Sequence, residues 1–389
     1  IRSLVANDWT ILGADEPARQ ADAAALAFDL KPVDDEKPAE RKTRHADEIV
    51  FYPAAWHGTL LPATDADTWL AAAFSDYEKI VSLENTIRKE TRGKPLKQSQ
   101  RDEIELARFA PWSQWLCAER RLGYDLALAD VQADWRSETW YTIAASKGVM
   151  LLAALREHFG KETFDAAMDT FGRQHAGKKV TTDEFIAHCE AQSGRSLTKF
   201  FAPWITTNAP DEQRSGNFWS IASFDPERDR ALIVYGTLHD VHAQREAAER
   251  LQRQIARLWS NVNVHIVKDY DVTDDQLRSR HILLVGRPAT NSVAARWADK
   301  LPIKFGDASF EFRGQTYAHP DTAVIAAGEN PMSGRYSVVV YAGLSADATW
   351  QVVNRLPKRD DPSPQTLLHP AGHPSRHLGA ARFEVPEKE

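Results

Sequence analysis

The spacing of the hydrophobic residues changes once along this chain, and that change constrains the fold more than any other feature. Residues 67–205 carry apolar positions three and four residues apart, which indicates amphipathic helices. Residues 231–356 instead alternate short apolar runs with helical patterns, which indicates strands joined by crossover helices. The stretch between them, TTNAPDEQRSGNFWS, has the composition of a linker. The sequence therefore predicts an α+β multidomain protein.

The first half is predicted to be an all-α domain. A charged, proline-containing connection over residues 1–47 precedes a helical domain at 48–207. The first long helix should start with Asp67 or Thr68 as its N-cap. A second helical stretch begins near residue 101 and should be interrupted at Pro111. Further helices are predicted at 141–158 and 161–175, and a third should begin with Thr182 as its N-cap and end at Gly194.

The second half is predicted to be a three-layer α/β doubly wound domain, flavodoxin-like or Rossmann-like, at residues 217–356. Strands that alternate with helices favour right-handed crossovers and a mostly parallel sheet. The segment SFEFRGQTYA should form a hairpin that turns at Gly314. Residues 357–389 are rich in proline and are predicted to be a loose tail.

The bulk composition excludes some classes of function. The net charge of −7 argues against a dedicated nucleic-acid binder, so we expect no nucleic-acid partner, whereas a peptide or protein partner fits. No apolar run approaches the roughly 20 residues that span a bilayer, so no membrane span is expected. The two cysteines, Cys117 and Cys189, leave one disulfide bridge and two free thiols equally open. The oligomeric state is not indicated.

Several motifs recur in an order that resembles a known family. The stretch WHGTLLPATDADTWLAAAFSDY, at 56–77, is followed by Lys147-Gly148, then by GKETF at 160–164 and by the segments 182–185 and 194–204. This series resembles the end of the catalytic domain in zinc aminopeptidases of the alanyl-aminopeptidase family (peptidase family M-one, gluzincins). The resemblance implies that the helical domain is gluzincin-like. The later α/β domain looks similar to domains appended to some bacterial exported peptidases.

The residues that carry the family's chemistry are missing from these motifs. The family pattern is His-Glu-x-x-His-x-Trp-x-Gly, a loop, and then Trp-Leu-Asn-Glu-Gly-Phe-x-x-Tyr. In that register Val50 and Ala54 stand at the two zinc-binding histidines, Phe51 at the general base, and Ala72 at the third zinc ligand. None of these side chains has a lone pair for zinc or can accept a proton from water.

Two further features of the family are also missing from this sequence. The tyrosine that stabilises the oxyanion, two residues before the Lys-Gly pair, is replaced by Ala145. Tyr141 lies one helical turn earlier and is a weak catalytic candidate, since an aromatic residue at helical spacing usually serves packing. Nothing in residues 1–49 matches the family's Gly-x-Met-Glu-Asn motif.

The leading hypothesis is a catalytically inactive relative of zinc aminopeptidases that acts as a binding or scaffolding module and holds no cofactor. One alternative is an active metallopeptidase of the aminopeptidase type that uses non-standard ligands or a missing N-terminal portion. The family resemblance, and nothing else in the sequence, favours an exported or periplasmic location over a cytoplasmic one.

Another alternative places a ligand-binding or hydrolytic function in the α/β domain. Gly236 and Thr237 follow a predicted strand and precede a helix, where an anion could be bound. Arg287 and Asn291 follow another buried strand, at the edge where doubly wound sheets bind ligands.

Other sequence patterns give weaker indications of a functional site. His239 and His242 are weak metal candidates, because such a pattern more often belongs to a polar loop at the carboxyl end of a strand. No Gly-x-Ser-x-Gly motif occurs, and no Ser-His-Asp arrangement can be argued from the sequence.

Overall fold

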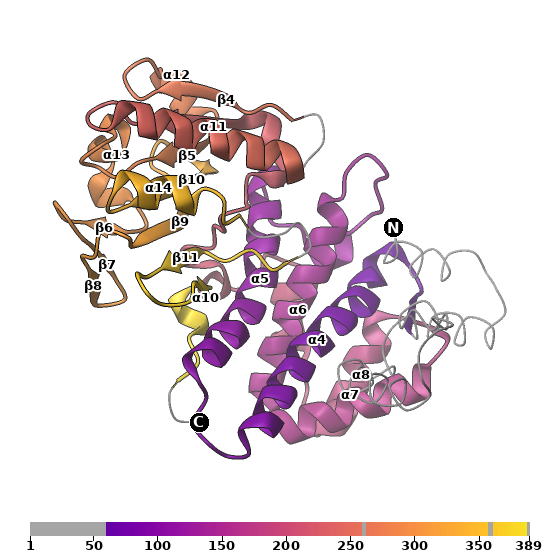
Figure 1. The fold of residues 1–389 in the computed structure, drawn as a ribbon. Coiled ribbons are helices and arrows are strands. Elements are labelled where there is room, and N and C mark those ends of the chain that lie inside the picture. The colour runs from indigo at the N-terminus through magenta and orange to yellow at the C-terminus, as the bar shows by residue number, and fades with distance from the viewer. Residues whose placement is uncertain (1–59, 259–261, 357–360, 387–389) are drawn as a thin grey trace, which may run out of the picture. The chain divides into compact units, whose positions relative to one another are not determined.

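The computed structural model describes residues 60–258, 262–356 and 361–386 (Figure 1). The chain divides into two compact units. Of the described residues, the helical unit holds Leu60–Leu96 and Tyr124–Ser215, and the sheet unit holds Lys97–Gly123 and those from Gly216 onward. The predicted mixture of helices and strands is confirmed, but the boundaries differ from 48–207 and 217–356, because a helix from within the first half belongs to the sheet unit.

The helical unit is built from α4 (Thr68–Thr91), α6 (Thr139–Phe159), α7 (Lys161–His175), α8 (Thr182–Ser193), α9 (Thr198–Ile205) and the short α10 (Asp211–Arg214). Strand β1 (Leu60–Pro62) pairs in parallel with β2 (Lys178–Val180). Within the described residues, no helix is long and apolar enough to cross a membrane.

The start of α8 corrects one expectation about capping. The N-cap is Thr181 and not Thr182: the Thr181 hydroxyl accepts a hydrogen bond from the Glu184 N–H at 3.2 Å, and the Glu184 carboxylate accepts one from the Thr181 N–H at 2.8 Å. This reciprocal pair is a capping box. The neighbouring Thr182 is free to bind another element, and its contacts are described with the candidate site.

The sheet unit contains one seven-stranded sheet in the order β12-β11-β9-β10-β5-β3-β4. The strands are β3 (Ala231–Tyr235), β4 (His265–Lys268), β5 (His281–Val285), β9 (Ala323–Asn330), β10 (Ser333–Gly343), β11 (Thr366–His369) and β12 (Arg376–Leu378). Strands β4, β3, β5 and β10 are parallel, whereas β9, β11 and β12 pair antiparallel. The predicted mostly parallel sheet is therefore wrong for nearly half of its strands.

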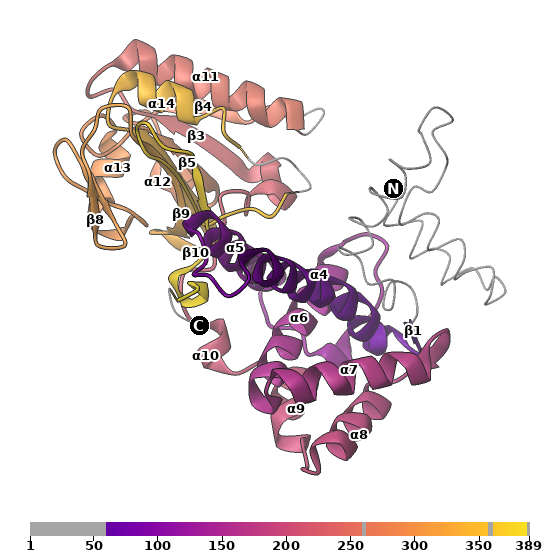
Figure 2. The same cartoon turned by 60° about the horizontal axis from the view of Figure 1, so that its bottom comes forward.

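Helices cover both faces of this sheet. α11 (Val241–Leu258) and α14 (Ala346–Val352) lie side by side over one face (Figure 1 and Figure 2). On the other face, α12 (Asp274–Arg278) and α13 (Ser292–Arg296) pack on a core that includes Leu277, Ile282 and Val338. A small sheet of β6 (Lys304–Phe305), β7 (Phe310–Phe312) and β8 (Gln315–Tyr317) covers a second core cluster. The predicted turn at Gly314 is confirmed, with a φ of 74°.

The C-terminal segment corrects the prediction of a loose tail. Strands β11 and β12 extend the sheet beyond β9, and Leu367, Leu368 and Leu378 are buried. Short segments with one or two leucines are enough here, because each strand uses only three or four residues to pair with a neighbour. The segment is thus part of the core and not an appendage.

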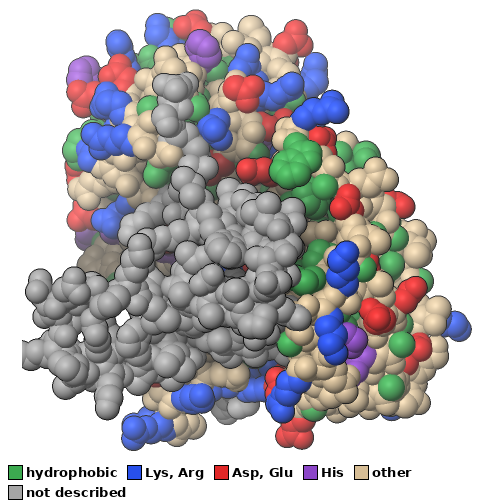
Figure 3. Space-filling view, turned by 90° about the vertical axis from the view of Figure 1, so that its right-hand side faces the viewer, with side chains coloured by type: hydrophobic (Ala, Val, Ile, Leu, Met, Phe, Trp, Pro, Cys, Tyr) green, Lys and Arg blue, Asp and Glu red, His purple; other side chains and the backbone are tan. Residues whose placement is uncertain are grey.

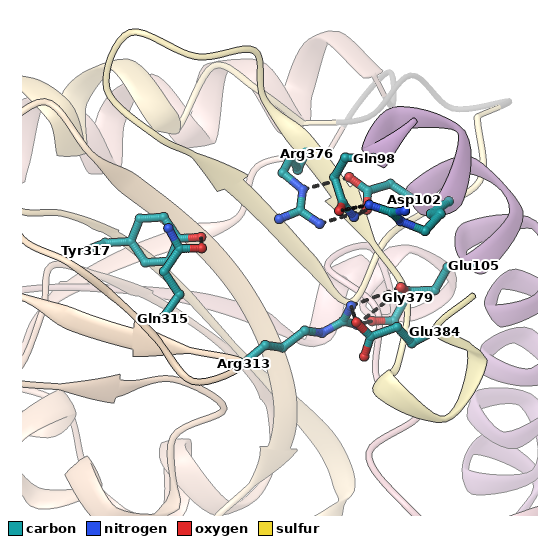
Figure 4. A network of polar contacts seen from close by, with 10 residues as sticks. Gln98, Asp102, Glu105, Arg313, Gln315, Tyr317, Arg376, Gly379 and Glu384 are labelled. Carbon is teal, nitrogen blue, oxygen red and sulfur yellow. Dashed lines mark hydrogen bonds and ion pairs between the residues drawn. The ribbon is translucent and has the colours of Figure 1, made fainter. Parts of the chain in front are cut away.

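Helix α5 (Gln98–Leu122) is held in the sheet unit by two arginine–carboxylate pairs (Figure 4). Arg376 of β12 donates to both oxygens of Asp102, at 2.7 and 2.8 Å. Arg313 of the hairpin donates to both oxygens of Glu105, at 2.9 and 2.6 Å. The helix continues through Pro111 without the predicted interruption. Bidentate pairs of this kind fix geometry as well as charge.

We predict that ending the chain after Leu356 leaves the sheet unit unfolded or aggregated. The truncation removes three buried leucines, and burial of each side chain stabilises the fold by about 1.5–3 kcal/mol. It also leaves the buried Asp102 carboxylate without its partner Arg376. Size-exclusion chromatography and thermal melting would measure the effect. Removal of residues 387–389 alone is the matched control. An unchanged melting temperature in the longer truncation would contradict the assignment of β11 and β12 to the core.

Candidate functional site

The aromatic residues of the motif at 56–77 pack together in the helical unit. The ring centroid of Trp69 lies 5.9 Å from that of Phe185, and Phe74 lies 5.4 Å from the same ring. Tyr77 lies 5.7 Å from Phe164. Each pair is edge-on, which is a favourable geometry for aromatic rings. Segments that the sequence analysis linked only by their order are therefore joined in space.

A buried carboxylate fixes the beginning of α4 to the beginning of α8. Asp67 is 6% exposed, and its Oδ1 accepts hydrogen bonds from the backbone N–H of Thr182 at 2.7 Å and from its hydroxyl at 2.9 Å. Its Oδ2 accepts from the N–H and hydroxyl of Thr64. The indole N–H of Trp69 donates to the Thr182 hydroxyl at 3.0 Å. These contacts orient Trp69 without any metal ligand.

The Lys147-Gly148 pair of α6 also serves packing. Lys147 is fully buried, and its ammonium donates to both carboxylate oxygens of Asp125, at 2.9 and 3.0 Å, and to the carbonyl of Leu126. A Cβ at Gly148 would lie 2.6 Å from the Cβ of Ala73, closer than real Cβ contacts allow. Residue 148 must therefore be glycine for α4 and α6 to approach this closely.

Two of the positions that the resemblance assigns to catalysis, Ala72 and Ala145, lie in the described residues and carry only methyl groups. Ala72 is 8% exposed and Ala145 is 5% exposed, so each side chain is an apolar part of the core. Val50, Phe51 and Ala54 lie outside the described residues. Among the residues that the structure does describe, no group of three or more His, Cys, Asp or Glu side chains is arranged to hold a metal ion. Tyr141 is half-buried, with its ring 5.6 Å from that of Trp140.

A cluster of charged residues in the same unit was not predicted. Arg156 of α6 lies 3.3 Å from Glu84 and 3.7 Å from Asp165. Burial, with the nearby carboxylates of Asp169 and Asp165, raises the pKa of Glu78 to about 7. Such a shift often accompanies a functional carboxylate, but ion-pair networks produce it as well. Sequence reasoning had no signal for it, since the acids come from two helices.

The ligand candidates of the sheet unit come together at the carboxyl ends of β3 and β5. A Cβ at Gly236 would lie 2.1 Å from the carbonyl oxygen of Thr290, so the two loops touch there. The Asn291 amide nitrogen donates to the carbonyls of Val234 and Val285, both at 3.1 Å. Its amide oxygen caps α13 by accepting from two backbone N–H groups.

The other two candidates have internal partners as well. The Thr237 hydroxyl donates to Asp269 at 2.5 Å, and the second oxygen of Asp269 accepts from the Ser292 N–H at 2.6 Å. Burial opposes ionisation of Asp269, but these hydrogen bonds outweigh it and lower its pKa. The Arg287 guanidinium donates to the carbonyl of Asp307. Together these bonds join the strand ends to one another.

The predicted histidines lie on the surface at the start of α11. His239 and His242 are both exposed, and His242 lies 3.6 Å from Glu246 one helical turn later. Neither belongs to a three-residue metal group within the described residues. Cys117 and Cys189 are both buried and free, which resolves the alternative that the sequence left open.

The structure adds a serine–histidine–glutamate line at the amino end of β5. The Ser337 hydroxyl lies 2.9 Å from His281 Nδ1, and His281 Nε2 lies 3.7 Å from Glu227. Ser337 is fully buried and His281 is 1% exposed. The backbone N–H of Ser337 also donates to Nδ1, at 3.1 Å, so this nitrogen is an acceptor already in use. The line therefore joins β5 to β10 and offers no accessible nucleophile.

We predict a pH dependence of stability from this line. Burial lowers the pKa of His281 below its ordinary 6.5, against the opposing effect of Glu227. The unfolded chain then binds a proton near pH 6.5 that the folded chain does not, so the free energy of unfolding falls as the pH falls through 6.5. Replacing His281 by Asn keeps an acceptor for Ser337 and removes the titration. The slope should decrease by up to about 1.4 kcal/mol per pH unit.

Urea denaturation across that pH range would measure the slope. H242N changes an exposed histidine and serves as the matched control. An H281N slope equal to that of the unaltered chain would contradict the prediction.

A second prediction concerns the buried Lys147–Asp125 pair. Substituting Lys147 by Met leaves the Asp125 carboxylate buried without its cation and should cost about 3–5 kcal/mol of the free energy of unfolding. The control is K79M, which breaks an exposed pair with Asp76 and should cost about 1 kcal/mol or less. Chemical denaturation of both variants would test this, and equal costs would refute a structural role for Lys147.

No protein-family model and no curated protein matches this chain.

Proposed function

We propose that this chain is a non-catalytic relative of the zinc aminopeptidases, with a gluzincin-like helical unit that serves as a binding or scaffolding module. The observation that carries the proposal is the pairing of an intact packing frame with apolar side chains where the chemistry would lie. Trp69, Phe74 and Tyr77 keep their aromatic contacts, whereas Ala72 and Ala145 are buried methyl groups.

The physical argument rests on the donor atoms that a zinc site requires. Structural and catalytic zinc sites use thiolate, imidazole or carboxylate ligands, and an alanine supplies none of these. The methyl group of Ala72 also cannot act as a general base, because it accepts no proton. We therefore propose that the unit retains a surface formed around the old site and no hydrolytic activity.

The alternative of a function in the α/β portion has less support. Thr237 and Asn291 use their polar atoms on Asp269, on two strand carbonyls and on the N-terminus of α13. A ligand would have to displace those bonds. The alternative of an active peptidase with non-standard ligands is addressed by the same experiment as the main proposal.

We expect the purified chain to hold no stoichiometric zinc and to hydrolyse no amino-acid anilide. The informative experiment restores the proposed register with V50H, F51E, A54H and A72E in one variant. If the register is right, the variant should bind about one zinc ion per chain, because two histidines and a carboxylate are the ligands of such sites. Elemental analysis after dialysis measures the metal content.

The matched control moves one ligand out of register by using A71E in place of A72E. Zinc in the control at the level of the restored variant would refute the register. Stoichiometric zinc with anilide turnover in the unaltered chain would refute the proposal as a whole.

A further inference from the structure

Three arginines of α11 form a stripe on one side of that helix. Arg250, Arg253 and Arg257 are spaced i, i+3 and i+7, which places them on one helical face over about 10 Å. Arg253 and Arg257 are exposed. The helix has no Asp or Glu from Arg250 to its end at Leu258. These three residues are called the arginine stripe.

One member of the stripe is held in place by α14. The guanidinium of Arg250 lies 3.4 Å from the ring centroid of Trp350, and its Nε donates to Asn354. Gln254 donates to the same Asn354 oxygen at 3.1 Å. Trp350 itself is 37% exposed. The stripe thus has an ordered cation at one end and an accessible aromatic ring beside it.

The charges of the stripe have no acidic partners in the described part of the chain. In the first half of α11, Arg245 pairs with Glu249 at 2.9 Å and His242 lies 3.6 Å from Glu246. No such pair forms at Arg253 or Arg257 within the described residues. Burial and the positive charges of Arg253 and Arg257 lower the pKa of Arg250, so the three cations repel one another.

Ordinary surface patterning does not account for this arrangement. Basic and acidic side chains are interspersed over the face drawn in Figure 3. A cation in the last turn complements the helix dipole, which explains Arg257 but not Arg250 or Arg253. Glu246 and Glu249 precede Arg250 and Arg253 by one helical turn, but they lie against His242 and Arg245 instead. Three like charges without ion pairs of their own in the described residues favour an external anion as their partner.

We propose that the arginine stripe binds a short acidic segment of a partner protein. Arginine forms bidentate pairs with carboxylates, and the exposed Trp350 ring adds an apolar contact next to them. A nucleic acid fits less well, because tight binding uses about 6–10 phosphate contacts and the stripe offers three cations on a chain of net charge −7. This inference does not depend on the proposed function of the helical unit.

The test is fluorescence anisotropy of a labelled peptide that contains a short run of glutamates, titrated with the full chain. We expect saturable binding that weakens with salt. The double variant R253E/R257E should weaken it about tenfold or more, since both exposed cations become repulsive. The matched control R278E/R296E makes the same change of net charge on α12 and α13, and it should leave the affinity within about twofold.

Three outcomes would overturn the proposal. One is no binding of the glutamate peptide to the unaltered chain. Another is equal weakening by both double variants, which would indicate general attraction by net charge. The third is tighter binding of single-stranded DNA of mixed sequence than of the peptide, with loss of the DNA binding in R253E/R257E. Circular dichroism of each variant confirms that α11 remains folded.

Discussion

The sheet unit depends on two bidentate ion pairs made by one turn of α5. Asp102 binds Arg376 and Glu105 binds Arg313, so a helix far away in sequence is joined to the last strand and to the hairpin (Figure 4). Both carboxylates are buried, and a buried charge is stable only when it is paired. These contacts decide which unit α5 belongs to and give the C-terminal segment a reason to pair with the sheet.

Helices, strands and turns that are specified by their own residues were predicted correctly from local sequence patterns. The helices at 139–159 and 161–175 and the turn at Gly314 follow from apolar spacing and glycine positions within a few residues. Strand β3 and the last four residues of β5 are continuous apolar runs, which is typical of strands buried on both faces. Each of these features is specified by its own residues, so a single sequence suffices.

Contacts between residues far apart in the sequence could not be predicted from local patterns. The pattern of residues 98–122 indicates a helix but not its neighbour, and that neighbour is set by arginines more than 200 positions later. Strands β11 and β12 are short and flanked by prolines, so their composition indicated a tail. Strand β9 has only Val324 and Ile325 as β-branched residues among alanines, a glycine and polar residues, although strands pair with it on both sides. Tertiary context outweighs propensity in all three cases.

Within the candidate site, the residues needed for packing differ from the residues that zinc chemistry would need. Gly148 is required by its approach to Ala73, and Lys147 is required by the buried Asp125. Such residues persist for packing whether or not zinc is bound, so their presence says little about catalysis. Zinc chemistry depends instead on ligand side chains that packing does not require. The small apolar side chain of Ala72 is itself buried in the core. In the proposed register the aromatic frame has no donor atoms and serves the packing of the helical unit, which directs attention to surfaces such as the arginine stripe for what the chain binds.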